Sequence, residues 1–284
     1  MNEKVKAAME RLEQGLETLL NSDEWRKFLQ FQAMFHRYSF ANTLLIMNQN
    51  HDATFVAGYN RWKELGRYVK KGERGIEIFA PLFRKARKAN TEEHDQESEE
   101  TVEKHNTDKK RALYGYRVVY VFDVSQTDGE PLPSVERPKI LVGESDLYAK
   151  LQQACPFPVD EVRSLGGANG EFNLRTHQIE IVHSLPKTHK AKTLIHEWAH
   201  GLLHTTGLLT SANKPWMELE AESTAFVVAH ALGLNTSDYS FGYIAGWSGK
   251  DALSTLKACG TRIQQAADSI LMALEEPQDL CKAI

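Results

Sequence analysis

The sequence predicts an α+β protein with two domains, one over residues 1–130 and one over residues 138–284. The chain of 284 residues is long enough for about two domains of ordinary size. Several long segments repeat apolar residues with a helical period, and shorter segments alternate apolar and polar residues as strands do. The segment Ser125–Pro138 contains three prolines and divides the chain between these two parts.

The composition excludes several protein classes. With 42% hydrophobic and 25% charged residues, the chain is neither collagen-like, nor a coiled coil, nor wholly disordered. Its net charge of −4 means that any nucleic-acid contact would need a local basic patch. Cys155, Cys259 and Cys281 are widely spaced, which favours neither a disulfide framework nor a cysteine zinc site. No apolar leader and no apolar run of about 18 residues occurs, so we expect a cytoplasmic protein without a membrane partner.

Helices and short strands are expected in the first domain. Apolar residues at helical spacing predict a helix over residues 3–21, and the polar break Asn21-Ser22-Asp23 could cap a second helix that begins near Glu24. The later elements are a helical continuation at 42–47, a strand at 54–58, a helical turn at 60–65, a basic hairpin punctuated by Gly66, Gly72 and Gly75, and two strands at 76–81 and 116–123 that could pair.

A highly charged segment interrupts these two strands. Residues 84–112 contain eight basic and eight acidic residues, and Val102 is their one large aliphatic side chain. So few apolar residues cannot offset the entropy cost of ordering the backbone. We expect a mobile insertion to which no function is assigned.

The second domain is expected to be mainly helical. Its predicted elements are a helix at 145–155, a glycine-rich turn at 166–170, a strand at 176–182, and helices at 188–206, 215–232 and 249–275. The segment 194–200, Leu-Ile-His-Glu-Trp-Ala-His, lies in the first of these last three helices.

This segment contains an HExxH motif. On a helix His196 and His200 lie one turn apart, so both imidazoles can bind one metal ion while Glu197 lies beside them. A catalytic zinc ion usually has three protein ligands and keeps one position for water. The motif therefore predicts a Zn²⁺ site in which Glu197 acts as the general base and passes the water proton to a leaving amine.

The next helix supplies candidates for the third ligand. Glu218 and Glu222 are four residues apart and share a helix face, whereas Glu220 points away. We assign Glu218 as the third ligand and Glu222 as the carboxylate that orients a ligating histidine; the reverse assignment stays open. His204 lies about 12 Å along the helix axis from His196, too far to share the ion.

Two further roles follow from a peptidase site. The strand at 176–182 is expected to be the sheet edge that binds an extended peptide by adding it as a strand. A hydrogen-bond donor opposite Glu197 would stabilise the oxyanion that forms on the attacked carbonyl. Tyr239, Tyr243 and His177 are the candidates for that donor, with no choice among them.

The first domain has a local excess of positive charge. Residues 22–83 carry nine basic and six acidic side chains, and aromatic residues are interleaved with the basic ones. Proteins that bind single strands combine base stacking on aromatic rings with a basic track for the backbone. The segment 70–75, with Lys70, Lys71 and Arg74, suits phosphates because its glycines allow a close backbone approach. The alternatives are that the aromatic residues form core and that this segment is a solvated turn.

Both halves resemble known families. The second half resembles the ImmA/IrrE-like and related gluzincin metallopeptidases, through HExxH and the downstream pattern of Glu218, Ala221 and Ala225. The first half resembles the N-terminal single-stranded-DNA-binding domain of ArdC-type antirestriction proteins. The matching strings are YSFAN at 38–42, ATFVAGY at 53–59, WKELGR at 62–67 and VKKGERGI at 69–76. The order of the two parts is also that of the ArdC family.

The resemblance implies a function. It implies a small domain that binds single-stranded DNA, followed by a minimal zincin-like metallopeptidase domain, in a protein that protects incoming plasmid or conjugative-element DNA from restriction. The partners would be single-stranded DNA and either an unidentified protein substrate or a restriction enzyme. The residues assigned to DNA contact are Arg37, Asn42, Trp62, Lys63, Arg67, Lys70, Lys71 and Arg74.

Two alternative functions stay open. The chain could be a regulatory metalloprotease of a mobile element that cleaves a repressor, or a DNA-binding protein whose metal site is purely structural. The intact Glu197 argues against the second, because a structural site has no use for a general base.

Overall fold

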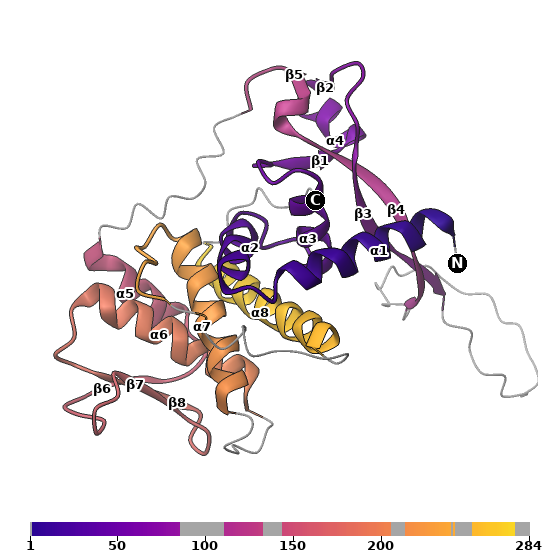
Figure 1. The fold of residues 1–284 in the computed structure, drawn as a ribbon. Helices are drawn as coiled ribbons and strands as arrows, with labels where there is room; N and C mark the ends of the chain where they lie inside the picture. Colours follow the sequence, from indigo (N-terminus) through magenta and orange to yellow (C-terminus); the bar gives the residue numbers. More distant parts are fainter. Residues whose placement is uncertain are drawn as a thin grey trace, which may run out of the picture.

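The computed structural model describes residues 2–85, 111–132, 144–205, 214–239, 241 and 252–275. The chain is an α+β protein, as the sequence predicts. A helical body lies in the middle of the molecule, with a long two-stranded ribbon and a small lobe at one end and a small sheet at the other (Figure 1). No helix among the described residues is long and apolar enough to cross a membrane.

Three helices begin the chain, and local polar residues set their limits. They are α1 (Glu3–Thr18), α2 (Ser22–Met34) and α3 (Phe40–Gln49). The Asn21 side chain accepts hydrogen bonds from the backbone N–H groups of Asp23 and Glu24, which confirms the predicted cap. The Ser39 side chain accepts one from the N–H of Asn42, so α3 starts anew after a break instead of continuing α2.

The first sheet has the strand order β1-β4-β3. Its strands are β1 (Val56–Gly58), β3 (Ile76–Lys85) and β4 (Arg111–Asp123), all antiparallel. This confirms the predicted pairing of the segments 76–81 and 116–123. The strands continue further than predicted, because Arg84 pairs with Ala112 and Lys85 with Arg111. The limits of the charged insertion at 84 and 112 were therefore wrong, and residues 86–110 lie outside the described residues.

A small lobe consists of the helix α4 (Tyr59–Glu64), two short strands and the segment 70–75. Its two strands are β2 (Arg67–Val69) and β5 (Thr127–Gly129), which pair antiparallel after the short helix η1 (Val124–Gln126). The predicted hairpin around Gly72 was therefore wrong, because β2 pairs with a strand that comes after β4. A Cβ atom on Gly129 would lie 2.5 Å from the carbonyl oxygen of Gly66, so this pairing needs a glycine there.

The second half packs helices beside a small sheet. Its elements are α5 (Glu144–Ala154), β6 (Val159–Val162), β7 (Gly170–Asn173), β8 (Gln178–Val182), α6 (Lys187–Leu203), α7 (Lys214–Ala231) and α8 (Ala252–Leu274). The strand order is β6-β8-β7, with β6 parallel and β7 antiparallel to β8. The edge role predicted for residues 176–182 was wrong, because β8 is the middle strand and both of its edges are paired.

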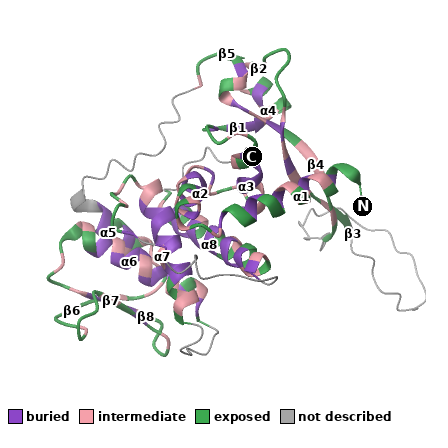
Figure 2. Cartoon of the chain, in the orientation of Figure 1, coloured by how far each residue is buried: buried purple, intermediate pink, exposed green. Residues whose placement is uncertain are grey.

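One hydrophobic core joins the two halves. It contains buried side chains from the first three helices and from α5 to α8, and Figure 2 shows these buried residues concentrated in the central helices. At the contact of α2 with α7, the indole N–H of Trp25 donates to the hydroxyl of Ser223 at 3.1 Å. A second, smaller cluster lies between the sheet and the helices α2 and α3. Residues 133–143, which include the last part of the predicted boundary Ser125–Pro138, lie outside the described residues.

Candidate metal centre

The helix α6 carries the HExxH motif on a face that meets α7. Leu194, Ile195 and Trp198 are buried in the core, and this apolar stripe fixes the rotation of the helix. His196 and His200 therefore share the other face, and their ring centroids lie 4.8 Å apart. Both rings are only partly exposed, with side-chain exposures of 22% and 15%.

Three atoms from α6 and α7 that could bind one metal ion converge. The Nε2 atoms of His196 and His200 lie 3.1 Å apart, and Oε2 of Glu218 lies 3.5 Å from the first and 3.7 Å from the second. Tetrahedral ligands at about 2.0–2.1 Å from a zinc ion are about 3.4 Å from one another. The three observed separations are close to that value, so this donor set fits such an ion.

Glu222 contacts the other nitrogen of His196. Its Oε2 atom lies 3.3 Å from Nδ1 of His196, one helical turn from Glu218. A carboxylate in this position holds the ring in one orientation and leaves Nε2 free to bind a ligand. The structure therefore brings together all four residues assigned from the sequence, with Glu218 facing both Nε2 atoms and Glu222 behind one ring.

Burial and charge shift the pKa values of this cluster. Burial acts to lower the pKa of His196, but hydrogen bonds with Glu218 and Glu222 outweigh it and raise that pKa to about 10. Hydrogen bonds with His196 and His200 hold the pKa of Glu218 well below its usual range. Burial raises the pKa of Glu197 to about 7. The carboxyl group of Glu197 thus lies in a water-poor environment, as a general base in a peptidase does.

A pocket of about 350 Å³ opens beside Glu197. Its lining residues are Asn169, Gly170, His189, Lys192, Thr193, His196, Glu197, Glu222, Asp238 and Tyr239. Among the three candidates for oxyanion stabilisation, Tyr239 lines this pocket. His177 lies in the turn between β7 and β8, with its ring over Phe172 at 6.1 Å. Tyr243 lies outside the described residues.

The strand β7 passes directly beside α6. A Cβ atom on Gly170 would lie 2.5 Å from Cγ2 of Thr193 and 3.0 Å from Cγ of Glu197. Only a glycine permits so close an approach between strand and helix. Glu197 also accepts a hydrogen bond from the backbone of Phe172 on this strand. The sheet edge next to the site is therefore β7 rather than the predicted strand 176–182.

A buried polar network lies behind His200 and was not predicted from the sequence. His204 caps the end of α6, and its Nδ1 lies 2.9 Å from Nδ1 of His200. Its Nε2 lies 3.0 Å from Oε2 of Glu220, which Arg262 of α8 also contacts at 2.8 Å. The signal in the sequence was the spacing of His196, His200 and His204, because residues four apart share one helix face.

Several residues that were predicted to contact DNA instead contact other parts of the protein. The ring of Trp62 is fully buried and its indole N–H donates to the carbonyl of Phe122, so its predicted stacking role is wrong. The side-chain amide of Asn42 donates a hydrogen bond to the carbonyl of Phe79 and accepts one from its N–H group. These two hydrogen bonds connect α3 to β3. Arg37 forms two hydrogen bonds with the carboxylate of Glu275, one to each oxygen.

The remaining predicted residues lie in or beside the small lobe. The guanidinium group of Arg67 donates to the hydroxyl and the carbonyl of Thr127, and Nζ of Lys70 donates to the carbonyl of Ser125. The side chains of Lys63, Lys71 and Arg74 are exposed.

The fold and the site define an α+β protein with a two-histidine, one-carboxylate cluster. Residues 2–122 match the model of the N-terminal domain of anti-restriction factor ArdC. This match confirms the resemblance to ArdC-type N-terminal domains that the sequence of the first half predicts.

Similar proteins cover most of the chain. The Mn(II)-bound crystal structure of the antirestriction protein ArdC from the R388 plasmid has a TM-score of 0.50 and 20% identity, covering 85% of this chain and 86% of that chain. Its metal-free structure has a TM-score of 0.48 and 21% identity, covering 84% and 85%. The uncharacterized Bacillus anthracis protein pXO2-81 is 24% identical over 97% of this chain, which spans 52% of that protein's length.

Proposed function

We propose that this chain is an antirestriction protein that binds single-stranded DNA and hydrolyses peptide bonds at a zinc site. The observation that carries the proposal is the convergence of His196, His200 and Glu218 beside the buried Glu197. A purely structural site would have no use for a carboxylate held next to an open pocket. The ArdC-type N-terminal domain supports the antirestriction role.

The donor set favours zinc among divalent metals. Two imidazoles and one carboxylate suit Zn²⁺, whereas Mn²⁺ prefers sites with more oxygen ligands. The R388 ArdC structure described above contains Mn(II), so manganese is the natural competitor in a binding test. When bound, zinc would supply a Lewis acid and would lower the pKa of its water toward about 7.

Each nearby residue has a role in peptide hydrolysis. Glu197 would accept the proton of the attacking water and deliver it to the leaving amine. The hydroxyl of Tyr239, in the same pocket, would donate a hydrogen bond to the developing oxyanion. An extended peptide would pair with the edge of β7 that faces away from β8, where the described residues supply no further strand; β7 lies beside Glu197 through the close contact at Gly170.

The small lobe is the proposed surface for single-stranded DNA. We define it as α4, β2, β5 and the segment 70–75, which stand apart from the helical body (Figure 1). Tyr59 and Tyr68 have exposures of 48% and 58%, so their rings can stack on bases where the buried Trp62 cannot. Nζ of Lys63 lies 4.8 Å from the centre of the Tyr59 ring. The basic side chains of the lobe that the proposal uses are Lys63, Arg67, Lys70, Lys71 and Arg74. Rings and cations together supply the two parts that such a surface needs.

The restriction of incoming DNA tests the proposal. Unmodified plasmid DNA is introduced into a restricting host that expresses the wild-type chain, Glu197→Gln, or the control Glu13→Gln at an exposed position on α1. We expect protection by the wild type and by the control, and loss of protection with Glu197→Gln. Equal protection by all three chains would show that peptide hydrolysis is not needed. No protection by the wild type would instead favour a regulatory protease.

A further inference from the structure

A buried chain of polar groups connects His200 to the surface of the molecule. It runs from Nδ1 of His200 to Nδ1 of His204 at 2.9 Å, and from Nε2 of His204 to Glu220 at 3.0 Å. Arg262 then contacts the same carboxylate oxygen at 2.8 Å. The side chains of His204 and Glu220 are 3% and 7% exposed, while Arg262 is 48% exposed.

Burial of these groups has to be offset by their contacts. A buried carboxylate is costly unless it is paired and hydrogen-bonded. Glu220 meets this requirement through Arg262, which also donates to the carbonyl of Leu203 in the last turn of α6. Arg262 therefore ties α8 both to the end of the motif helix and to Glu220.

The direction of each hydrogen bond follows from the metal site. A neutral imidazole has one ring N–H, so a His200 that binds a metal through Nε2 carries its proton on Nδ1. That proton can be donated only to Nδ1 of His204, which must then be unprotonated. His204 consequently carries its own proton on Nε2 and donates it to Glu220. Both histidine donors point away from the metal and toward the carboxylate of Glu220, which Arg262 contacts from the surface side.

We infer that His204 is a positioning residue that fixes the orientation and tautomer of His200, with Glu220 and Arg262 fixing His204 in turn. The inference rests on the metal site of the proposed function. Glu222 plays the corresponding part for His196 directly, at 3.3 Å from Nδ1. The two ligating histidines are thus held by different means, one by a carboxylate and the other through a second histidine.

Metal affinity of the full chain tests this inference. Zn²⁺ binding is measured by competition with a chromophoric chelator for the wild type, His204→Leu and His204→Gln. The leucine has a similar volume but accepts no hydrogen bond, so we expect affinity to fall by about 10–100-fold. The glutamine oxygen can accept from Nδ1 of His200, so His204→Gln should recover part of that affinity. Arg262→Gln should reduce affinity less than His204→Leu.

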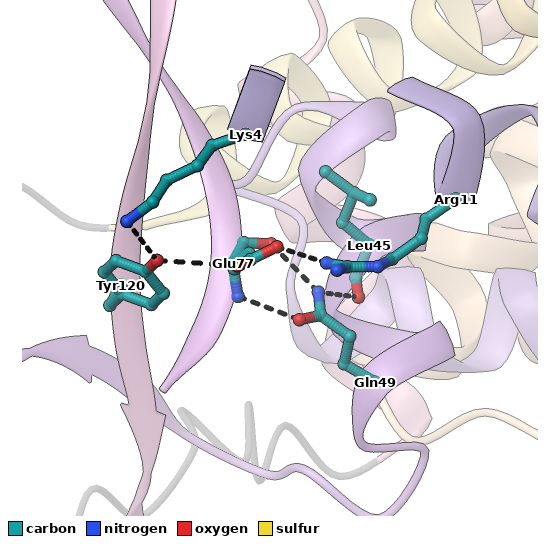
Figure 3. Close-up of polar contacts among 6 residues, drawn as sticks. All are labelled: Lys4, Arg11, Leu45, Gln49, Glu77 and Tyr120. Atoms are coloured by element: carbon teal, nitrogen blue, oxygen red, sulfur yellow. Dashed lines mark hydrogen bonds and ion pairs between the residues drawn. The ribbon is translucent and has the colours of Figure 1, made fainter. Parts of the chain in front are cut away.

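Two ion pairs outside the metal cluster, Arg11 with Glu77 and His36 with Asp268, provide control variants. Arg11→Gln removes the cation paired with Glu77, in a contact between α1 and β3 that Figure 3 shows. His36→Gln removes the partner of Asp268, at 2.9 Å. Neither change should alter zinc affinity.

The tautomers provide a second measurement, which a merely structural role would not affect. In zinc-loaded wild type with ¹⁵N-labelled histidine, NMR should show a protonated Nδ1 on His200 and a protonated Nε2 on His204. A proton on Nδ1 of His204, or zinc affinity unchanged in His204→Leu, would overturn the inference. If His204→Leu does not fold, the tautomers of the wild type decide alone. A wild type that binds no zinc would overturn the proposed metal site itself, and this inference with it.

Discussion

Oε2 of Glu222 lies 3.3 Å from Nδ1 of His196, on the opposite side of the ring from Glu218, whose Oε2 lies 3.5 Å from Nε2. The two carboxylates lie one turn apart on the same face of α7, and in the folded chain each reaches a different nitrogen of this ring. Only the Glu218 oxygen also faces His200, at 3.7 Å. This asymmetry gives the two glutamates different expected effects on metal binding.

Removal of Glu218 should affect zinc binding more than removal of Glu222. Glu218→Ala deletes one of the three proposed ligands and should abolish tight binding. Glu222→Ala leaves all three ligands but frees the ring of His196, and should weaken binding by about 10–100-fold. Metal analysis and chelator competition on the purified full chain measure both effects. A larger effect of Glu222→Ala would reverse the assignment.

Replacement of Gly170 should destabilise the contact between β7 and α6. The new methyl group of Gly170→Ala would lie 2.5 Å from Cγ2 of Thr193, and such overpacking costs about 1–3 kcal/mol of unfolding free energy. Gly115→Ala is the control, because no described residue other than its two chain neighbours has an atom within 4 Å of its Cβ position. Denaturant unfolding measures both changes.

A second substitution can locate the clash. Thr193→Ser deletes Cγ2 and should restore part of the stability that Gly170→Ala removes. Additive effects of the two substitutions would show that β7 does not pass α6 as closely as described.

The local features of the fold and the site could be predicted from the sequence. Helical periodicity and capping depend on neighbouring residues, so the helices and the cap at residues 21–23 could be predicted. The same periodicity predicts that His196 shares a helix face with His200, and Glu218 with Glu222. The pairing of 76–81 with 116–123 was also predictable, because both segments have an apolar pattern that suits strands.

Long-range pairing and burial could not be predicted. β2 was expected to pair within its own hairpin, but no local pattern shows that its partner is β5. The middle position of β8 likewise depends on β6 and β7, whose polar and glycine-containing segments carry weak strand signals. Trp62 in a basic segment suits either base stacking or a core position, and only the packed structure distinguishes the two.

A buried and an exposed aromatic residue of the small lobe should separate stability from DNA binding. Trp62→Ala removes a fully buried ring and should lower the unfolding free energy by about 3–5 kcal/mol. Tyr68→Ala removes an exposed ring, and should leave stability unchanged within about 0.5 kcal/mol. Its affinity for a labelled oligothymidine should fall by about 1–3 kcal/mol if a base stacks on the ring. Unchanged affinity in both Tyr68→Ala and Tyr59→Ala would place the DNA surface elsewhere.

The salt dependence of DNA affinity should show how many phosphate contacts the basic side chains of the same lobe make. For a single strand, the slope of log affinity against log salt decreases by about 0.7 for each phosphate that a cation no longer neutralises. Replacing Lys70, Lys71 and Arg74 together by glutamine should therefore reduce the slope by about 2 if all three bind phosphates. Fluorescence anisotropy at several salt concentrations on the full chain gives this slope.

A charge-matched control separates local contacts from net charge. Lys6, Lys27 and Lys257 are exposed on helices outside the lobe, and replacing them by glutamine changes the net charge equally. This control should keep the wild-type slope, since exposed charges beyond about 10 Å are largely screened at 0.1 M salt. Glu197→Gln should also keep it, because the carboxylate is buried beside the metal cluster. Equal reductions in the lobe variant and the control would contradict the proposed DNA surface and indicate a general electrostatic effect.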